Sequence, residues 1–328
     1  MNAGTRLEYL RNVLKERGLS GGFITSPANI RYLTPQIEVP SGQALLVTPD
    51  SLRVRAPAET GTNLPSRLVG TDRGPAGNSR DHPGPADLSA VLAAMRRVKD
   101  DDEVAQIAEA AACVDRGLEA ARATMHTGVT DTALVESARI AVLKNTCAPV
   151  EFAFNIGAGR AGADPEATSS GVVLAPGDAV FIDLYPRVGA YFADATRTFS
   201  TGDPPPHLDT ITTALWAALD AAAALLRPGA RAADIDRRCR QELEARGIAA
   251  DYPHHTGHGV GLEQQEPPWL TPHSPDALMA GDVVALEPGV YSEAMGARVE
   301  ELYVVRPDGP QLISHASRSL HGGGDRGT

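Results

Sequence analysis

The sequence predicts an α/β fold built on a duplicated unit of two helices and a β-hairpin, with a small α/β domain in front of it. Two stretches carry the duplication: Leu174–Asp183 (LAPGDAVFID) aligns with Leu278–Glu287 (LMAGDVVALE). In each stretch, a Gly-Asp turn opens an apolar strand that ends in a carboxylate five residues after that Asp. Upstream, each half has a glycine in a turn before a helix, Gly128 in the first half and Gly229 in the second. Two such halves packed face to face would bring their carboxylates to one centre.

Composition places the chain among globular enzymes of two domains, or of one large and one small domain. It has 328 residues, of which 42% are hydrophobic and 22% charged, and a net charge of −11. No run of Lys or Arg is present to neutralise phosphates, which argues against a nucleic-acid partner. No apolar run approaches membrane-spanning length, and the first residues are charged and amphipathic, unlike a signal peptide. We therefore expect a cytoplasmic protein whose three cysteines are free thiols.

Residues 1–87 predict a shortened α/β domain. Its helical residues show apolar side chains at helical spacing, and its strands are short apolar runs. The expected elements are a helix over residues 5–17, a strand over 22–26, a short helix over 27–34 and a strand over 44–48. The stretch 55–87 is rich in Pro and Gly and poor in large apolar residues, which is typical of a linker.

Residues 88–320 predict the large domain that holds the duplication, and residues 321–328 (HGGGDRGT) predict a disordered tail. Each half should contribute two helices with a buried apolar stripe, followed by strands. The expected helices span 102–125, capped by Asp102, and 131–144, 208–226 and 233–246. The expected strands span 151–156 and 171–174, a hairpin over 179–199, and 282–287 and 298–305.

Four carboxylates and one histidine are the candidate metal ligands. Asp183 and Asp194 lie on adjacent strands of the first hairpin, and Glu287 and Glu300 occupy the corresponding places in the second half. Buried carboxylates repel one another unless a cation lies between them. His258 lies between two glycines, where backbones can approach closely. This hard, oxygen-rich set favours two Mn²⁺-like ions, about 3.5–4 Å apart, sharing carboxylates and a bridging hydroxide.

Four segments of the sequence resemble the metal motifs of one known family. They are DLYPRVGAYFADATRTF from Asp183, HHTGHGVGLEQQEPP from His254, ALEPGVY from Ala285 and ARVEELYVV from Ala297. The family is that of the pita-bread metallopeptidases, which includes aminopeptidase P, prolidase, methionine aminopeptidase and the metal-free relative creatinase. The resemblance covers about residues 95–308, and residues 5–55, with NIRYLT, resemble the start of a creatinase-type N-terminal domain that is cut short.

The resemblance implies roles for the candidate ligands. Asp194 and Glu300 would bridge two divalent ions, Asp183 would hold one of them, and His258 and Glu287 the other. Glu287 would also act as general base toward the bridging water. The ions implied are Mn²⁺ first, with Fe²⁺, Co²⁺ or Zn²⁺ as alternatives. The family further implies a homodimer and a small-molecule or short-peptide substrate.

The substrate side of the site departs from the family pattern. Gln265 stands where the family has a histidine, and Glu166, after Pro165, stands where it has a second one. Gln forms hydrogen bonds but carries no proton at physiological pH. We interpret Glu166 and Gln265 as adapting the pocket to a cationic or strongly donating substrate, the alternative for Glu166 being a solvated loop residue. His254 is then the remaining candidate proton donor, and Tyr191 a candidate pocket residue.

Together these observations predict a dinuclear-metal hydrolase that cleaves a C–N bond of peptide, amide or amidine type in a small amino-acid-derived substrate. Xaa-Pro peptides are one possible substrate class. A second interpretation is a non-hydrolytic metalloenzyme that uses the same two ions for an elimination, rearrangement or redox step. A third is a catalytically silent interaction module. Metal-free chemistry of the creatinase kind is disfavoured, because four retained carboxylates would repel one another around an empty centre.

Overall fold

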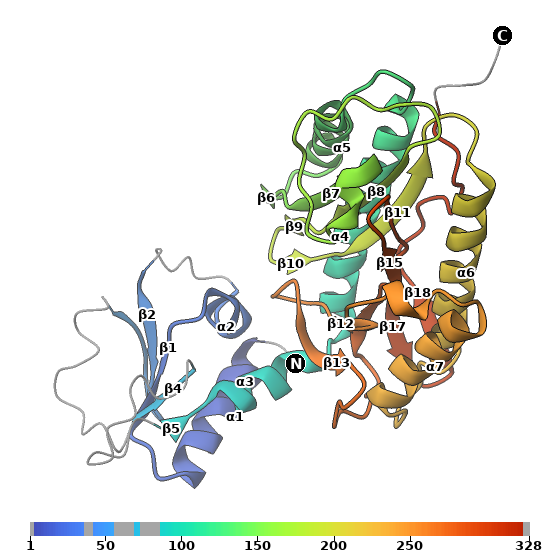
Figure 1. Cartoon of the computed structure of the whole chain (residues 1–328). Coiled ribbons are helices and arrows are strands. Elements are labelled where there is room, and N and C mark those ends of the chain that lie inside the picture. Colours follow the sequence, from blue (N-terminus) through green and yellow to red (C-terminus); the bar gives the residue numbers. More distant parts are fainter. Residues whose placement is uncertain (1–2, 36–41, 56–68, 73–85, 324–328) are drawn as a thin grey trace, which may run out of the picture. The chain divides into compact units, whose positions relative to one another are not determined.

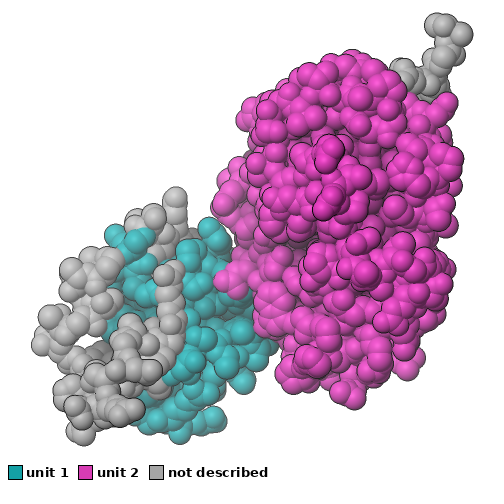
Figure 2. Space-filling view, in the orientation of Figure 1, with its two compact units in different colours: residues 1–96 teal, residues 97–328 magenta. Residues whose placement is uncertain are grey.

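The chain divides into two compact units, Met1–Arg96 and Arg97–Thr328, which Figures 1 and 2 show. The computed structural model describes residues 3–35, 42–55, 69–72 and 86–323. The first unit extends beyond the predicted boundary at residue 87, because the helix that follows packs within it. In this helix, the backbone oxygen of Met95 accepts a hydrogen bond of 2.5 Å from the Tyr32 hydroxyl.

The first unit is a small α/β unit, as predicted, and its mixed sheet has five strands rather than the two expected from the sequence. The strand order is β3-β2-β1-β4-β5, in which β1 pairs antiparallel with β2 and parallel with β4. The elements are α1 (Ala3–Glu16), β1 (Gly21–Ile24), α2 (Pro27–Leu33), β2 (Ala44–Val47), β3 (Leu52–Arg55), β4 (Val69–Thr71), β5 (Ala86–Asp87) and α3 (Ser89–Arg97).

Strands β4 and β5 lie within the stretch 55–87, which the sequence predicted to be mostly loop and linker. They pair in parallel with each other and extend the sheet beyond β1. Strands of three and two residues carry no periodic apolar pattern, so the sequence gives no signal for them. The rest of the predicted linker, 56–68 and 73–85, lies outside the described residues.

The second unit contains the helices and strands of the duplication. Its helices are α4 (Asp101–Thr124), α5 (Asp131–Lys144), α6 (Pro206–Ala223) and α7 (Ala232–Ala245), with 3₁₀ turns η3 (Gly159–Ala163) and η4 (Ala249–Asp251). Its strands are β6 (Val150–Glu151), β7 (Phe154–Ala158), β8 (Ala179–Leu184), β9 (Arg187–Val188), β10 (Tyr191–Phe192), β11 (Ala195–Ser200), β12 (Gly257–Gly259), β13 (Glu266–Leu270), β14 (Val283–Leu286), β15 (Gly289–Tyr291), β16 (Gly296–Arg298), β17 (Glu301–Arg306) and β18 (Gly309–Leu312).

The predicted duplication is confirmed by the sheets and by matched backbone contacts. The first half has strand order β11-β8-β7, and the second half repeats it as β17-β14-β12 within a five-stranded sheet. The amide of Gly128 donates to the oxygen of Leu174 at 2.8 Å, and that of Gly229 donates to Leu278 at 2.8 Å. Both glycines have positive φ, +88° and +84°, which side chains with a Cβ rarely adopt. This shared backbone conformation accounts for the repeated glycine in the sequence.

Three predicted details of the second unit are corrected by the structure. Helix α4 is capped by Asp100 rather than Asp102, because the side chain of Asp100 and that of Glu103 form a reciprocal capping box. Residues 171–174 form only an isolated bridge, from Val173 to Thr130. The predicted disordered tail is ordered at its start, where the amide of Gly323 donates to the oxygen of Arg122 at 2.7 Å. Residues 324–328 lie outside the described part of the chain.

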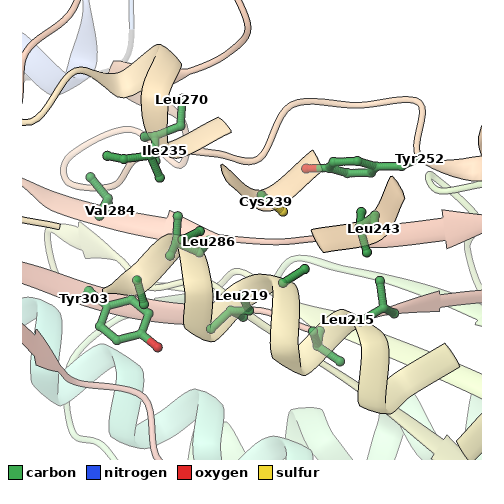
Figure 3. Packing of buried hydrophobic residues seen from close by; sticks show 14 of the residues in the cluster. Leu215, Leu219, Ile235, Cys239, Leu243, Tyr252, Leu270, Val284, Leu286 and Tyr303 are labelled. Carbon is green, nitrogen blue, oxygen red and sulfur yellow. The ribbon is translucent and has the colours of Figure 1, made fainter. Parts of the chain in front are cut away.

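The core of the second half lies between helices α6 and α7 and the strands beside them. Figure 3 shows Leu215 and Leu219 of α6, Cys239 of α7 and Leu286 of β14, which belong to one buried apolar cluster. Every residue of β8, β11 and β14 is buried. This burial explains the apolar runs that end at the candidate ligands. Among the described residues, no helix is both long and apolar enough to cross a membrane.

Candidate metal centre

The two hairpins meet through Thr196 and Glu300. The amide of Glu300 donates to the oxygen of Thr196 at 3.0 Å, and the Thr196 hydroxyl donates to Oε2 of Glu300 at 2.8 Å. Asp183 lies in β8 opposite Thr196 in the strand register, and Asp194 directly precedes β11. Glu287 directly follows β14. In the same register it lies opposite Glu300, the residue before β17. The strand pairing therefore places all four predicted carboxylates around one point.

His258 joins the carboxylates from strand β12. Its Nε2 lies 3.4 Å from Oε1 of Glu287 and 3.8 Å from Oδ2 of Asp194. Its Nδ1 lies 3.0 Å from the oxygen of Gly259, which can only accept a hydrogen bond, so Nδ1 carries the proton. The unprotonated Nε2 therefore faces the carboxylates, as a metal-ligating imidazole requires.

The glycines beside His258 are required by the close packing of three strands. A Cβ on Gly257 would lie 1.9 Å from the backbone oxygen of Ala285, and a Cβ on Gly259 would lie 2.4 Å from that of Pro267. The strands β13 and β14 flank β12 on either side. Any larger residue at these two positions would displace the strand that carries His258.

Two overlapping groups of side chains have the spacing of metal ligands. One ligand atom from each of Asp194, His258 and Glu300 lies within 4.8 Å of the others. The same spacing holds for His255, His258 and Glu287. His258 is common to both groups, so the two groups form one centre.

Burial and mutual repulsion dominate the electrostatics of this centre in the absence of ions. Burial, followed by repulsion from neighbouring carboxylates, raises the pKa of Asp194 and of Glu300 well above the ordinary values. Burial also raises the pKa of Asp183, although the guanidinium of Arg298, 2.6 Å away, opposes the shift. Glu287 differs: burial opposes its ionisation, but the contact with His255 and the electrostatic interactions with the nearby histidines outweigh it and lower its pKa to about 2.

Four buried polar atoms at this centre have no hydrogen-bond partner among the described residues. They are Oδ1 of Asp183, Oδ1 of Asp194, Oε1 of Glu287 and Nε2 of His255. A buried polar atom without a partner costs about 1–3 kcal/mol, and more when it is charged. Carboxylate oxygens and imidazole nitrogens are also the donors that divalent cations prefer in proteins. The residues present therefore fit a divalent metal centre.

Comparison with known proteins gives the family. Residues 105–307 match the profile of Metallopeptidase family M24, and residues 6–63 match that of the Creatinase/Prolidase N-terminal domain. The chain belongs to the metallopeptidase family M24. It is therefore a metal-dependent hydrolase with the pita-bread fold, as predicted.

Relatives of this M24 protein include peptidases from several bacteria. The "Uncharacterized peptidase YqhT" of Bacillus subtilis (strain 168) is 26% identical over 96% of this chain and 99% of that protein. The "Probable dipeptidase PepE" of Mycobacterium tuberculosis (strain ATCC 25618 / H37Rv) is 31% identical over 70% of this chain. That match spans 62% of the PepE protein.

Solved structures show the same fold. The Xaa-Pro dipeptidase from Bacillus anthracis superposes with a TM-score of 0.85 at 22% identity, covering 98% of this chain and 99% of that one. Dipeptidase PepE from Mycobacterium ulcerans superposes with a TM-score of 0.84 at 26% identity, covering 97% of each chain. Both regions of the M24 protein thus superpose on single chains of solved dipeptidase structures.

The predicted substrate-binding residues Glu166 and Gln265 differ in how their segments contact the metal centre. Glu166 is exposed, but its loop is tied to the centre, because Arg298 donates to the oxygen of Pro165 at 3.2 Å. Gln265 is exposed, whereas its neighbour Gln264 donates from Nε2 to Oδ2 of Asp194 at 3.3 Å. Sequence reasoning missed Gln264, because nothing in the irregular turn before β13 indicates which of the two amides faces inward.

Tyr191 and His254 are held by other groups. The Tyr191 hydroxyl donates to Oε1 of Glu103, at the start of α4, at 2.7 Å. This hydroxyl is therefore bound outside the candidate metal centre. Nδ1 of His254 lies 2.9 Å from a backbone oxygen, and Nε2 lies 3.2 Å from the Tyr291 hydroxyl. Burial lowers the pKa of His254, so the ring is neutral and Nε2 accepts from Tyr291.

His255 lies closer to the centre than the predicted His254. Its Nε2 is 2.9 Å from Oε1 of Glu287, an ion-pair distance, although the two atoms do not form a regular hydrogen bond. Burial lowers the pKa of His255, but the interactions with Glu287 outweigh burial and raise it overall. The sequence signal that could have identified His255 is its spacing of three residues from His258.

Proposed function

We propose that this M24 metallopeptidase is a dinuclear-metal hydrolase that cleaves a C–N bond in a small amino-acid-derived substrate, Xaa-Pro dipeptides included. The observation that carries the proposal is the convergence of four buried polar atoms without hydrogen-bond partners where the two hairpins meet. Relatives named as a probable dipeptidase and an Xaa-Pro dipeptidase support a short substrate. The likeness to aminopeptidase P and prolidase also favours a homodimer.

The ligand set divides between two ions in this proposal. Asp194 and Glu300 would serve both ions, Asp183 would complete one site, and His258 and Glu287 would complete the other. Four carboxylates and one imidazole favour Mn²⁺. When bound, two divalent ions supply Lewis-acid activation of water and of the substrate carbonyl.

The chain's own residues supply proton transfer and orientation. Glu287 is ionised at neutral pH because its pKa is held at about 2, and its Oε1 has no hydrogen-bond partner among the described groups. It can therefore accept a proton from the attacking water. Arg298 donates to Asp183 at 2.6 Å and to the Tyr291 hydroxyl at 3.1 Å. This contact fixes Asp183, and through Tyr291 it orients the ring of His254, whose Nε2 accepts from Tyr291 and therefore has no proton to give to the leaving group in this arrangement.

Glu166 supports a substrate that carries a positive or strongly donating group. It is an exposed carboxylate on a loop that Arg298 ties to the centre through Pro165. A carboxylate there attracts an amine or guanidine, which a histidine at that position would not do at neutral pH. Gln264, against Asp194, adds an amide where a substrate would enter.

The test is hydrolysis of a panel of Xaa-Pro dipeptides by the full chain reconstituted with Mn²⁺, with release of the N-terminal amino acid as the readout. We expect turnover that Glu287→Gln abolishes and that Glu244→Gln, an exposed substitution on α7, leaves unchanged. Metal content is measured on the same samples. Protein that holds two ions but releases no amino acid from any peptide would contradict the peptidase assignment.

A further inference from the structure

His255 belongs to the centre by geometry, although it is absent from the ligand set that the family resemblance implies. It lies in the segment between η4 and β12, two residues before β12 begins. Its Nε2 and Oε1 of Glu287 lie 2.9 Å apart. Both atoms are buried, and neither has a hydrogen-bond partner in the described part of the chain. Two buried atoms this close, without a regular hydrogen bond between them, can both face a third partner that lies beside the pair.

We propose that His255 is a further ligand to the metal ion held by His258 and Glu287, so that two imidazoles and the Glu287 carboxylate would bind this ion together with the shared carboxylates of Asp194 and Glu300. The inference rests on the proposed metal function and deepens it. One ligand atom from each of the three residues lies within 4.8 Å of the others. The Glu287 oxygen is 2.9 Å from His255 and 3.4 Å from His258. Ligand atoms about 2.0–2.2 Å from one ion lie about 2.8–3.1 Å apart at a 90° angle and about 3.3–3.6 Å apart at the tetrahedral angle, which includes both distances.

The segment that carries His255 is held in place by side chains outside the centre. The Tyr252 hydroxyl donates to the backbone oxygen of His255 at 2.9 Å. The Thr256 hydroxyl donates to Oδ1 of Asp236 at 2.8 Å, and Arg240, on the same helix, donates to the oxygen of His254 at 2.7 Å. Helix α7 therefore fixes the backbone on both sides of His255, which is how proteins pre-orient a metal ligand.

A second imidazole changes which metals the centre prefers. Carboxylate-rich sites suit Mn²⁺ and Mg²⁺, whereas imidazole suits Zn²⁺, Fe²⁺ and similar ions. Two histidines and a glutamate are also the protein ligands of some catalytic zinc sites. With His255, the site that His258 and Glu287 complete gains affinity for Zn²⁺ and Co²⁺, while the site that Asp183 completes keeps carboxylate ligands only.

The competing explanation is that His255 only donates a hydrogen bond to Glu287. Two substitutions separate these roles. His255→Ala removes both functions, while His255→Gln keeps a hydrogen-bond donor and removes the imidazole. His254→Ala is the matched control, because it removes the adjacent histidine, whose Nε2 contacts the Tyr291 hydroxyl and not Glu287.

The experiment titrates metal-free full-length protein with Zn²⁺, Co²⁺ and Mn²⁺ separately, measuring stoichiometry, affinity and the visible spectrum of bound Co²⁺. Both His255 variants should lose about 10–100-fold in Zn²⁺ and Co²⁺ affinity for one ion, lose less for Mn²⁺, and change the Co²⁺ spectrum. His254→Ala should keep the wild-type affinities. The inference is overturned if both His255 variants keep the wild-type affinities and spectrum, or if His255→Gln alone keeps them. Wild-type protein that binds no pair of ions would instead overturn the proposed function itself.

Discussion

Arg298 and Asp183 form a buried ion pair of 2.6 Å that joins the two halves of the duplication. Asp183 comes from β8 of the first half, and Arg298 from β16 of the second. The same guanidinium donates to the Tyr291 hydroxyl and to the oxygen of Pro165. One cation therefore partly balances the carboxylates and links them to the loop of Glu166.

Removing this cation should destabilise the metal-free protein strongly. Arg298→Met removes the cationic partner of Asp183, which then lies buried among other carboxylates. Removing one side of a buried ion pair typically costs about 3–5 kcal/mol. The control is Arg306→Met, which removes an ion pair with Asp101, whose side chain is 91% exposed, and should cost about 0–1 kcal/mol. The measurement is the free energy of unfolding from urea titrations. Equal losses for the two variants would contradict this role of Arg298.

The buried pair of Lys99 and Glu266 should behave differently in single and double variants. Their charged atoms lie 2.7 Å apart, and the side chains are 1% and 2% exposed. Gly261 packs directly on them, since a Cβ there would lie 2.5 Å from Oε1 of Glu266. Glu266→Gln should lower the free energy of unfolding by about 3–5 kcal/mol, because it leaves the Lys99 ammonium unpaired.

The double variant Lys99→Met with Glu266→Gln tests that mechanism. It removes the unpaired charge, so it should be more stable than Glu266→Gln alone. The pair also anchors the segment that carries Gln264, so we expect Glu266→Gln to weaken peptide turnover as well. A double variant whose loss equals the sum of the single losses would show that the two side chains act independently.

Glu166→His should change substrate preference without disturbing the loop. The backbone of Glu166 is held on both sides, by Oδ1 of Asp164 at 2.9 Å and by Nδ2 of Asn155 at 3.1 Å. If Glu166 attracts a cationic substrate group, the ratio of kcat/KM for Arg-Pro over Ala-Pro should fall about five- to tenfold in the variant. Glu244→His, on the surface of α7, is the control. An unchanged ratio would make Glu166 a solvated loop residue.

The sequence could predict the duplication because its signal is repeated. The turns at Gly128 and Gly229 recur in both halves, and each is closed by the same backbone contact, to Leu174 and to Leu278. The four carboxylates follow from that repeat, because strand register places them together once the halves are aligned. Buried strands such as β8 are also visible as apolar runs.

The parts that the sequence could not predict depend on irregular backbone. His254 and His255 are adjacent in a segment without strand or helix, so no period indicates which ring faces Glu287. Gln264 and Gln265 differ in the same way, because the register shifts between β12 and β13 at His258 and Gly259. In both cases, tertiary contacts determine which side chain faces the metal centre, and these contacts cannot be predicted from a single sequence.

Cysteine reactivity gives a test of the core that does not depend on the metal centre. Cys147 is exposed, while Cys113 and Cys239 are buried. Cys239 lies within the α6–α7 core, where Figure 3 shows it near Leu243 and Tyr252. Burial raises the pKa of Cys239 to about 11, from 9.0 for an ordinary thiol. Between pH 9 and 11 the folded protein therefore retains a proton that the unfolded chain loses.

The predicted outcome is that iodoacetamide at pH 8 modifies one cysteine of the native protein, Cys147, and all three after denaturation. The thiolate is the reactive form, and a thiol with a raised pKa forms little of it at this pH. Cys147→Ser should then take up no label while folded. Above pH 9 the thiol of Cys239 ionises in the unfolded chain but not in the folded protein, so the free energy of unfolding should also fall as pH rises. This fall should be less steep in Cys239→Ala. Mass spectrometry of the peptides identifies the labelled cysteines. Labelling of native Cys239 at the rate of Cys147 would show that this core opens readily.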